Sequence, residues 1–143
     1  MNAQPERDYS GRSLFEKLGV VAQAHVALVG RHETSFTVAL NARLAKAASE
    51  ALRTRYDLIF LRVDAPSDLI RIARASAHLK PAGALWIFHP KGPGASPSDA
   101  EVRSSGIAAG LVDNKISAYS DSHTATRFVI PIVRRSLPEL SVS

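Results

Sequence analysis

Short runs of consecutive apolar residues divide the chain and predict strands that are buried on both faces of a sheet. These runs are 25–29, 58–63 and 84–88, and they are apolar at every position except His25 and Arg62. Such a pattern, rich in Val, Ile, Leu and Phe, is typical of parallel strands that are covered by helices on both sides. Two later segments, 112–119 and 126–133, alternate between apolar and polar residues. They predict the strands of a C-terminal hairpin, joined by the polar turn 120–124.

Between the strands, apolar residues recur three or four positions apart, as they do on one face of a helix. This spacing predicts helices at 13–19, 68–78 and 98–110. Ser67 is expected to cap the second of these helices, and Ser98 opens a capping box before the third. The segment 34–53 has two interpretations. It forms either one helix, or a helix that breaks near Asn41 and is followed by a short strand around residues 44–48.

Strands that alternate with helices predict a sheet with right-handed crossovers and helices on both faces. The predicted fold class is α/β: a three-layer open sandwich with a mostly parallel sheet and an antiparallel C-terminal hairpin at one edge. A length of 143 residues suits one domain, which we place at 13–135. Residues 1–12 are expected to form an irregular N-terminal lead-in, and residues 136–143 a C-terminal tail.

Composition excludes several classes of function. The chain has no cysteine, which excludes a disulfide framework, a thiolate metal site and a cysteine nucleophile. Its five histidines lack the spacing of known metal motifs, so no metal is expected. The apolar runs are far shorter than the roughly 20 residues of a membrane helix, and the first residues lack an apolar signal core. We therefore expect a cytoplasmic protein that does not bind membranes.

The charge balance points to an anionic partner. Lys and Arg number 18 against 13 Asp and Glu, which gives a net charge of +5, and 13 of the cations are Arg. Guanidinium groups bind phosphate and carboxylate with two parallel hydrogen bonds, so a small anionic ligand is expected. The cations are spread along the chain, and few aromatic residues accompany them for stacking on bases. Nucleic acid is therefore the less favoured partner, and a basic nucleic-acid-binding module is retained only as a second alternative.

Ligands of open parallel sheets bind beyond the carboxyl ends of the strands. The polar or flexible residues expected there are the ligand-binding candidates Gly30, Arg31, His32, Asp64, His89 and Lys91. They are predicted to form one small polar pocket, and no catalytic residue is assigned.

The segment 121–123, with the sequence Asp-Ser-His, contains the residue types of a catalytic triad. Neighbours in sequence rarely point toward one place, and the chain has no Gly-x-Ser-x-Gly turn. A polar hairpin turn is therefore the preferred interpretation of these three residues.

The order of several motifs resembles the C-terminal half of class I S-adenosylmethionine-dependent methyltransferases. The turn and strand LKPAGALWI at 79–87 and the pair Gly110-Leu111 after the next helix carry this resemblance. Residues 9–133 are also similar to a small bacterial family that is catalogued as a domain of unknown function. The matching motifs are YSG at 9–11, KLG at 17–19, ALW at 84–86, PK at 90–91, GLVDNK at 110–115 and RFV at 127–129. The resemblance implies a Rossmann-like, methyltransferase-like fold.

One segment departs from the methyltransferase pattern. Methyltransferases hold the methionine part of the cofactor at a glycine-rich turn after the first strand, and an acidic residue after the second strand binds the ribose. Here Gly30 is followed by Arg31, His32 and Glu33, and no acidic residue closes a clear second strand, Glu50 being the one candidate. We therefore expect no cofactor and the non-catalytic binding of a small anionic ligand or partner. A divergent S-adenosylmethionine-dependent methyltransferase is the alternative, and a homodimer through the terminal hairpin is compatible with the exposed strand edges.

Overall fold

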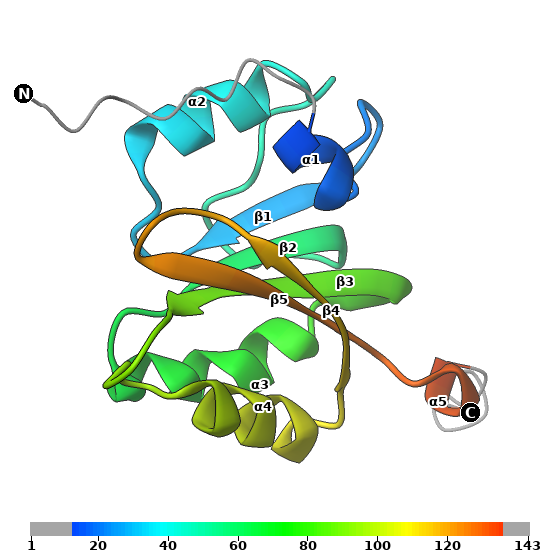
Figure 1. The fold of residues 1–143 in the computed structure, drawn as a ribbon. Coiled ribbons are helices and arrows are strands. Elements are labelled where there is room, and N and C mark those ends of the chain that lie inside the picture. Colours follow the sequence, from blue (N-terminus) through cyan, green and yellow to red (C-terminus); the bar gives the residue numbers. More distant parts are fainter. Residues whose placement is uncertain (1–12, 136–143) are drawn as a thin grey trace, which may run out of the picture.

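A five-stranded mixed sheet is the centre of the molecule (Figure 1). The computed structural model describes residues 13–135. The strands are β1 (Val26–Val29), β2 (Tyr56–Arg62), β3 (Leu79–Pro90), β4 (Val112–Ala118) and β5 (His123–Val129), in the order β1-β2-β3-β5-β4. The pairs β1–β2 and β2–β3 are parallel, whereas β5 is antiparallel to both β3 and β4. The predicted open sheet with an antiparallel C-terminal hairpin at one edge is confirmed.

Helices lie on both sides of this sheet and complete the predicted three-layer sandwich (Figure 1). One face carries α1 (Ser13–Lys17) and α2 (Thr34–Asn41). The other carries the 3₁₀ helix η1 (Pro66–Ile70), α3 (Arg71–Ser76) and α4 (Asp99–Ala108). A short helix, α5 (Ile132–Arg135), follows β5. No helix of the described chain combines the length and the apolar character needed to cross a membrane.

Each face of the sheet has its own apolar core, which explains the all-apolar runs of the sequence. In β2, Leu58 and Phe60 pack in the layer beneath α1 and α2. Their neighbours Ile59 and Leu61 pack in the layer beneath α3 and α4. Successive side chains of a strand point to opposite faces, so a strand with a core on each side needs an apolar residue at every position. Burial of each such side chain contributes about 1.5–3 kcal/mol.

The segment 34–53 contains a helix and one extended residue. Helix α2 ends at Asn41, as the second interpretation of the sequence expected. The expected strand at 44–48 is reduced to one parallel bridge at Ser49, which pairs with Ala27 of β1. Ser49 accepts from the amide of Leu28 and donates to the carbonyl of Val26, each at 2.8 Å. The strand-like pairing therefore lies after residues 44–48, where the sequence pattern predicts it, and involves a single residue.

The helix expected at 68–78 begins earlier, as η1, and the prediction that Ser67 caps it was wrong. The carboxylate of Asp68 accepts from the amides of Asp64 and Ala65 at 2.9 and 3.1 Å. Pro66 stands at the first position of this turn, where its fixed φ favours helix and its missing N–H is not needed. In contrast, the capping box at Ser98 is confirmed, because its hydroxyl accepts from the amide of Glu101 at 3.1 Å.

The last strand also differs from its predicted bounds. It was expected at 126–133, but β5 runs from His123 to Val129 and α5 begins at Ile132. Pro131 has no N–H for the sheet, which is consistent with a strand that ends before it. The early start brings His123 opposite Pro90 at the end of β3. The predicted lead-in 1–12 and tail 136–143 lie outside the described residues.

Candidate functional site

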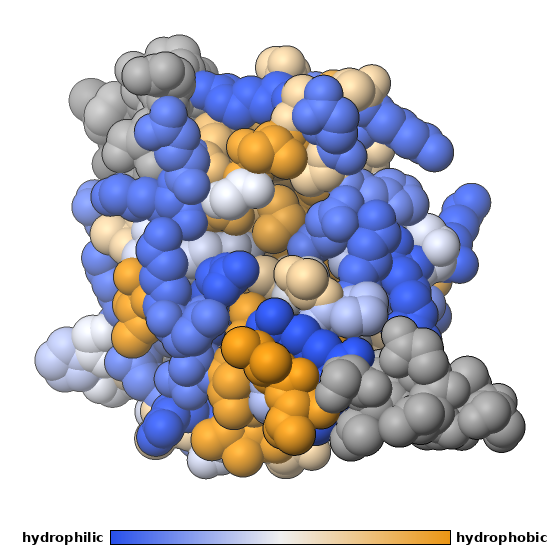
Figure 2. Space-filling model, turned by 90° about the vertical axis from the view of Figure 1, so that its right-hand side faces the viewer, coloured by the Kyte–Doolittle hydropathy of each residue, from blue (hydrophilic) through white to orange (hydrophobic). Residues whose placement is uncertain are grey.

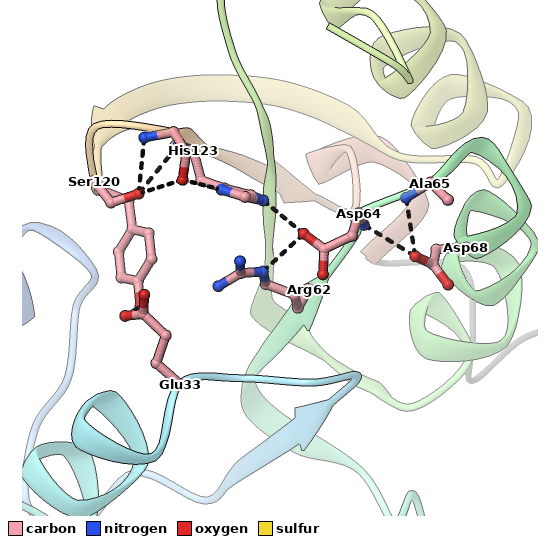
Figure 3. A network of polar contacts seen from close by, with 9 residues as sticks. Glu33, Arg62, Asp64, Ala65, Asp68, Ser120 and His123 are labelled. Carbon is pink, nitrogen blue, oxygen red and sulfur yellow. Dashed lines mark hydrogen bonds and ion pairs between the residues drawn. The ribbon is translucent and has the colours of Figure 1, made fainter.

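The carboxyl ends of β1, β2 and β3 meet at one edge of the sheet, at the left of Figure 1, and β5 starts there because it runs in the opposite direction. Asp64 follows β2, while His123 is the first residue of β5. Their contact joins two elements that are 59 residues apart in sequence: Nε2 of His123 lies 2.7 Å from Oδ1 of Asp64. The same oxygen accepts from Nε of Arg62 at 3.1 Å (Figure 3).

Asp64 is an ionised carboxylate in this arrangement. Burial raises its pKa, but the hydrogen bonds from His123 and Arg62 outweigh burial, and the net pKa lies below the usual value. Its side chain is 48% exposed, whereas those of Arg62 and His123 are 14% and 9% exposed. The carboxylate can only accept hydrogen bonds, so Nε2 of His123 carries the hydrogen.

A tight turn continues this network from His123. Oγ of Ser122 lies 2.8 Å from Nδ1 of His123. The hydroxyl of Ser120 accepts from the amides of both Ser122 and His123, at 3.3 and 3.1 Å (Figure 3). Sequence reasoning selected Asp64 but not His123, because the predicted hairpin placed residue 123 in a solvated turn rather than in a strand.

His32 belongs to the aromatic layer beneath α2. Its Nε2 donates to the carbonyl of Phe60 at 2.7 Å, and its ring stacks on Phe36 and meets Phe88 edge-on. Burial lowers the pKa of His32, an effect that the carbonyl of Phe60 partly offsets. Its Nδ1 has no hydrogen-bond partner among the described residues. The ring is therefore a neutral packing element of the protein interior.

His89 and Lys91 line a cavity of about 190 Å³ between the end of β3 and the start of α4. His89 is 1% exposed, and its Nε2 lies 2.8 Å from the hydroxyl oxygen of Thr126. Its Nδ1 is 3.6 Å from a carboxylate oxygen of Asp99. Burial lowers the pKa of His89, although the charge of Asp99 raises it in part.

Gly30 lines a different cavity, of about 300 Å³, at the carboxyl end of β1. Its φ is +93°, and a Cβ at this position would lie 2.8 Å from the carbonyl oxygen of Arg62. A glycine is therefore required where the chain leaves β1 close beside β2.

The other walls of this cavity combine apolar and charged side chains. Leu28, Val29, Ala51 and Leu52 supply apolar surface, and Glu50, Arg71 and Arg74 supply charge. Within the described chain, the side chains of these three charged residues make no hydrogen bond or ion pair. Glu50 directly follows Ser49, whose bridge to Ala27 holds it beside β1.

The six candidate residues thus occupy several places along one edge of the sheet. His89 and Lys91 share a cavity, Gly30 lines another, and Asp64 belongs to the network with His123. The side chain of Arg31 is exposed. Sequence reasoning missed Arg71 and Arg74, which appear in the pattern only as polar positions on the outer side of a helix. Among residues 13–135, no three His, Asp or Glu side chains gather as a metal site requires.

A further cavity, of about 550 Å³, lies at the opposite end of the strands, where the parallel strands begin. Figure 2 shows this face of the molecule, with apolar residues in a hollow and hydrophilic residues around it. The walls include Leu18, Leu58 and Ala84, with Lys115 and Arg127 from the hairpin. This hollow could not be predicted from the sequence, because its lining residues come from five separate segments of the chain.

Comparison with solved structures places this geometry in a known architecture. A methyltransferase dependent on S-adenosylmethionine from Aquifex aeolicus aligns with a TM-score of 0.62 at 12% identity, over 83% of this chain and 89% of that one. The CcbJ methyltransferase from Streptomyces caelestis aligns with a TM-score of 0.59 at 11% identity, over 90% and 91% of the two chains. The chain has a methyltransferase-like fold. At such low identity the likeness shows the fold alone.

The mitomycin 7-O-methyltransferase MmcR shares the same fold, with a TM-score of 0.60 at 11% identity over 76% of this chain. The present chain spans about half of that enzyme, 50% of its length. No family model matches the sequence, so membership in the small bacterial family stays a prediction. No curated protein matches it either.

A methyltransferase-like fold implies S-adenosylmethionine, and this chain fits only part of that molecule. Glu50 and the apolar wall beside Gly30 suit a nucleoside with its ribose hydroxyls. The turn that would hold the methionine part contains His32, whose ring is packed among aromatic side chains, and Glu33, which accepts from the Tyr119 hydroxyl at 3.0 Å. These side chains contact their own chain across the strand ends, and the usual pose of the methionine part does not fit.

Proposed function

We propose that the protein binds a small anion with a nucleoside-like body in the cavity beside Gly30, without carrying out chemistry on it. The observation that carries this proposal is the position of Glu50, Arg71 and Arg74 around one cavity, with no partner for their side chains within the described chain. Charged groups at the rim of an apolar cavity are the usual means of fixing the orientation of a small ligand.

The chemistry of the walls defines the ligand class. Arg71 and Arg74 are three positions apart on α3 and therefore neighbours on the helix surface. Two adjacent guanidinium groups match a phosphate or carboxylate. Glu50 is an acceptor for vicinal hydroxyls, and Val29 and Leu52, which are partly buried on the α3 side of the sheet, offer apolar surface to a flat ring. Two cations against one carboxylate leave the cavity with a positive balance, which favours an anion.

Calorimetric titration with adenosine monophosphate and with adenosine tests this proposal directly. The monophosphate should bind, and adenosine should bind at least about tenfold more weakly because it lacks the anionic group. Arg71→Gln and Arg74→Gln should each weaken monophosphate binding about tenfold, in line with about 1.5 kcal/mol for a charged hydrogen bond. Glu50→Gln should weaken binding of both compounds.

Arg103→Gln provides the matched control. Arg103 lies on the neighbouring helix α4 and pairs with Asp113, so its substitution removes the same charge at another place. If Arg103→Gln weakened monophosphate binding as much as Arg71→Gln does, the loss would reflect a general charge effect. That result would overturn the assignment of the ligand to the cavity beside Gly30. Failure of the monophosphate to bind at millimolar concentration would overturn the proposal itself.

A divergent methyltransferase is the second candidate, and the position of Glu50 favours it. In methyltransferases an acidic residue after the second strand binds the ribose, and Glu50 follows Ser49, which pairs with the outer edge of β1. Titration with S-adenosylmethionine and S-adenosylhomocysteine separates the two candidates. Micromolar affinity for either compound, lost in Glu50→Gln, would replace the non-catalytic proposal with this one.

A further inference from the structure

We propose that Ser122 is an activated nucleophile that accepts acyl groups from activated esters. The proposal uses other residues than the cavity beside Gly30 and stands independently of the function proposed for it. It rests on a hydroxyl, an imidazole and a pair of backbone amides at the turn between β4 and β5, and on a carboxylate that follows β2 (Figure 3).

The protonation pattern of His123 makes it a base toward Ser122. The ionised Asp64 accepts from Nε2 at 2.7 Å, which fixes the hydrogen of the neutral ring on that nitrogen. Nδ1 then has a free lone pair, and Oγ of Ser122 lies 2.8 Å from it. The serine hydroxyl can only donate to this lone pair. A nucleophile bonded to a base that a third group orients is the arrangement found in serine hydrolases.

The carboxylate comes from a distant part of the chain. The neighbouring Asp121 would complete a triad in sequence only, whereas Asp64 approaches His123 from the end of β2. Arg62 donates to the same oxygen of Asp64 at 3.1 Å and keeps the carboxylate ionised. Asp64 is therefore a positioning residue, because it holds the imidazole in one tautomer and one orientation.

Two amides beside Ser122 converge on a single oxygen atom. The N–H groups of Ser122 and His123 both donate to Oγ of Ser120, at 3.3 and 3.1 Å. That oxygen lies 3.4 Å from Oγ of Ser122. Successive amides that converge next to a nucleophile are the donors that stabilise an oxyanion during acyl transfer. The Ser120 hydroxyl occupies the position that a substrate oxygen would take, and rotation about its χ1 would vacate it.

Exposure completes the arrangement. Ser122 is exposed, so an ester can reach its hydroxyl, whereas the side chain of His123 is only 9% exposed. In the first step Oγ bonds to the ester carbonyl carbon, and the serine proton passes to Nδ1 of His123. The bond from that carbon to the alkoxide then breaks, and the alkoxide takes the proton from Nδ1. Water repeats the sequence on the acyl-serine, releases the acid and returns the proton to Ser122.

A fluorophosphonate probe tests the nucleophile without requiring turnover. The serine oxygen forms a bond to phosphorus, fluoride leaves, and His123 takes the serine proton. Intact mass and peptide mapping should place one adduct on Ser122. Ser104, which is exposed on α4, is the control within the same molecule, and its labelling should be at least about 100-fold slower.

Three variants assign the roles. Ser122→Ala should abolish the adduct, and Asp64→Asn should slow labelling at least tenfold and change its dependence on pH. Ser120→Ala should accelerate labelling several-fold, because it frees the two amides. A purely structural turn would be labelled no faster than Ser104 and would not respond to Ser120→Ala, and that result would overturn the proposal. Circular dichroism of each variant confirms that the fold is intact.

Hydrolysis of p-nitrophenyl acetate provides a second measurement. Release of p-nitrophenol should show a burst of about one equivalent per chain, because the acyl group stays on Ser122 until water releases it. Hydrolysis at the same rate by Ser122→Ala would contradict the proposed role of the hydroxyl.

Discussion

The indole nitrogen of Trp86 donates a hydrogen bond of 3.0 Å to the carbonyl oxygen of Leu18. Trp86 lies in the middle of β3 and is fully buried, and Leu18 directly follows the last turn of α1. This bond fixes the N-terminal helix on the sheet across 68 residues of sequence. It also satisfies an indole N–H that has no access to water, as a buried tryptophan requires.

We predict that Trp86→Phe lowers the free energy of unfolding by about 3 kcal/mol. The variant loses the hydrogen bond, leaves the Leu18 carbonyl without this donor and creates a cavity beside α1. Urea denaturation followed by circular dichroism measures the change. Val21→Ala, at a residue that is 59% exposed, should change stability by less than about 0.5 kcal/mol. A similar loss in both variants would contradict the structural role of the indole.

Two glycines with similar backbone angles should respond differently to substitution. Gly30 and Gly92 have φ near +93° and +94°. A Cβ on Gly92 meets no atom within 4 Å, whereas one on Gly30 approaches the Arg62 carbonyl to 2.8 Å. Gly92→Ala should cost about 1 kcal/mol, from the left-handed conformation alone. Gly30→Ala should cost about 3 kcal/mol, because β1 and β2 must also separate. Equal thermal shifts for the two variants would contradict the close approach at Gly30.

Stability should fall as the pH drops below about 6.5. Burial lowers the pKa of both His32 and His89, so the unfolded chain binds protons more readily than the folded one. Their contribution is complete above the unfolded pKa of 6.5 and is lost as pH falls toward the folded values, by about 1.4 kcal/mol for each unit of lowering. Melting temperatures measured from pH 8 to 5 should show this decline.

Substitution of the same histidines tests the cause of that decline. His32→Gln and His89→Gln should each flatten the dependence of the melting temperature on pH, since glutamine does not titrate. The exposed site of Lys46 offers a control, and Lys46→Gln should leave the slope unchanged. An unaltered slope in both histidine variants would assign the pH dependence to other groups.

The contact between Asp64 and His123 should be visible as a coupling energy. In a double-mutant cycle with Asp64→Asn and His123→Gln, the loss of unfolding free energy in the double variant should differ from the sum of the two single losses by about 1–2 kcal/mol at pH 7. The pKa of Asp64 is lowered in the folded state, so this stabilisation is present above the unfolded pKa of 3.8 and is lost as pH falls through the folded value. A coupling energy near zero would show that the contact does not form in solution.

The strands of the core could be predicted from sequence because their pattern has one physical cause. Each position of 58–61 faces a core on one side of the sheet or the other, so every one is apolar. Ser49 pairs with β1 as an isolated residue. Its pairing could not be predicted, because a single residue shows no repeating pattern of apolar and polar positions. The bounds of β5 were missed for a related reason: His123 and Thr124 are polar, yet they pair with the end of β3.

The candidate site could be predicted only in part. The rule that ligands bind at the carboxyl ends of parallel strands selected Gly30 and Asp64, and both lie at that edge. It could not select His123, which reaches the edge through an antiparallel strand whose bounds the sequence did not show. It also could not select Arg71 and Arg74, since a cation on the outer side of a helix has the same pattern whether it meets solvent or a cavity.

The bridge at Ser49 indicates where the fold can accept additional residues. In the described chain β1 is the first strand of the sheet order, and Ser49, in the connection from residue 42 to 55, pairs with it on its outer side. We expect extra residues introduced near Ser49 to pair along the outer side of β1 and to leave the crossover into β2 unchanged. Lengthening a surface connection carries a small entropic penalty. We therefore expect the cavity beside Gly30 to be enlarged most easily from this side of the molecule, where residues 50–52 line it.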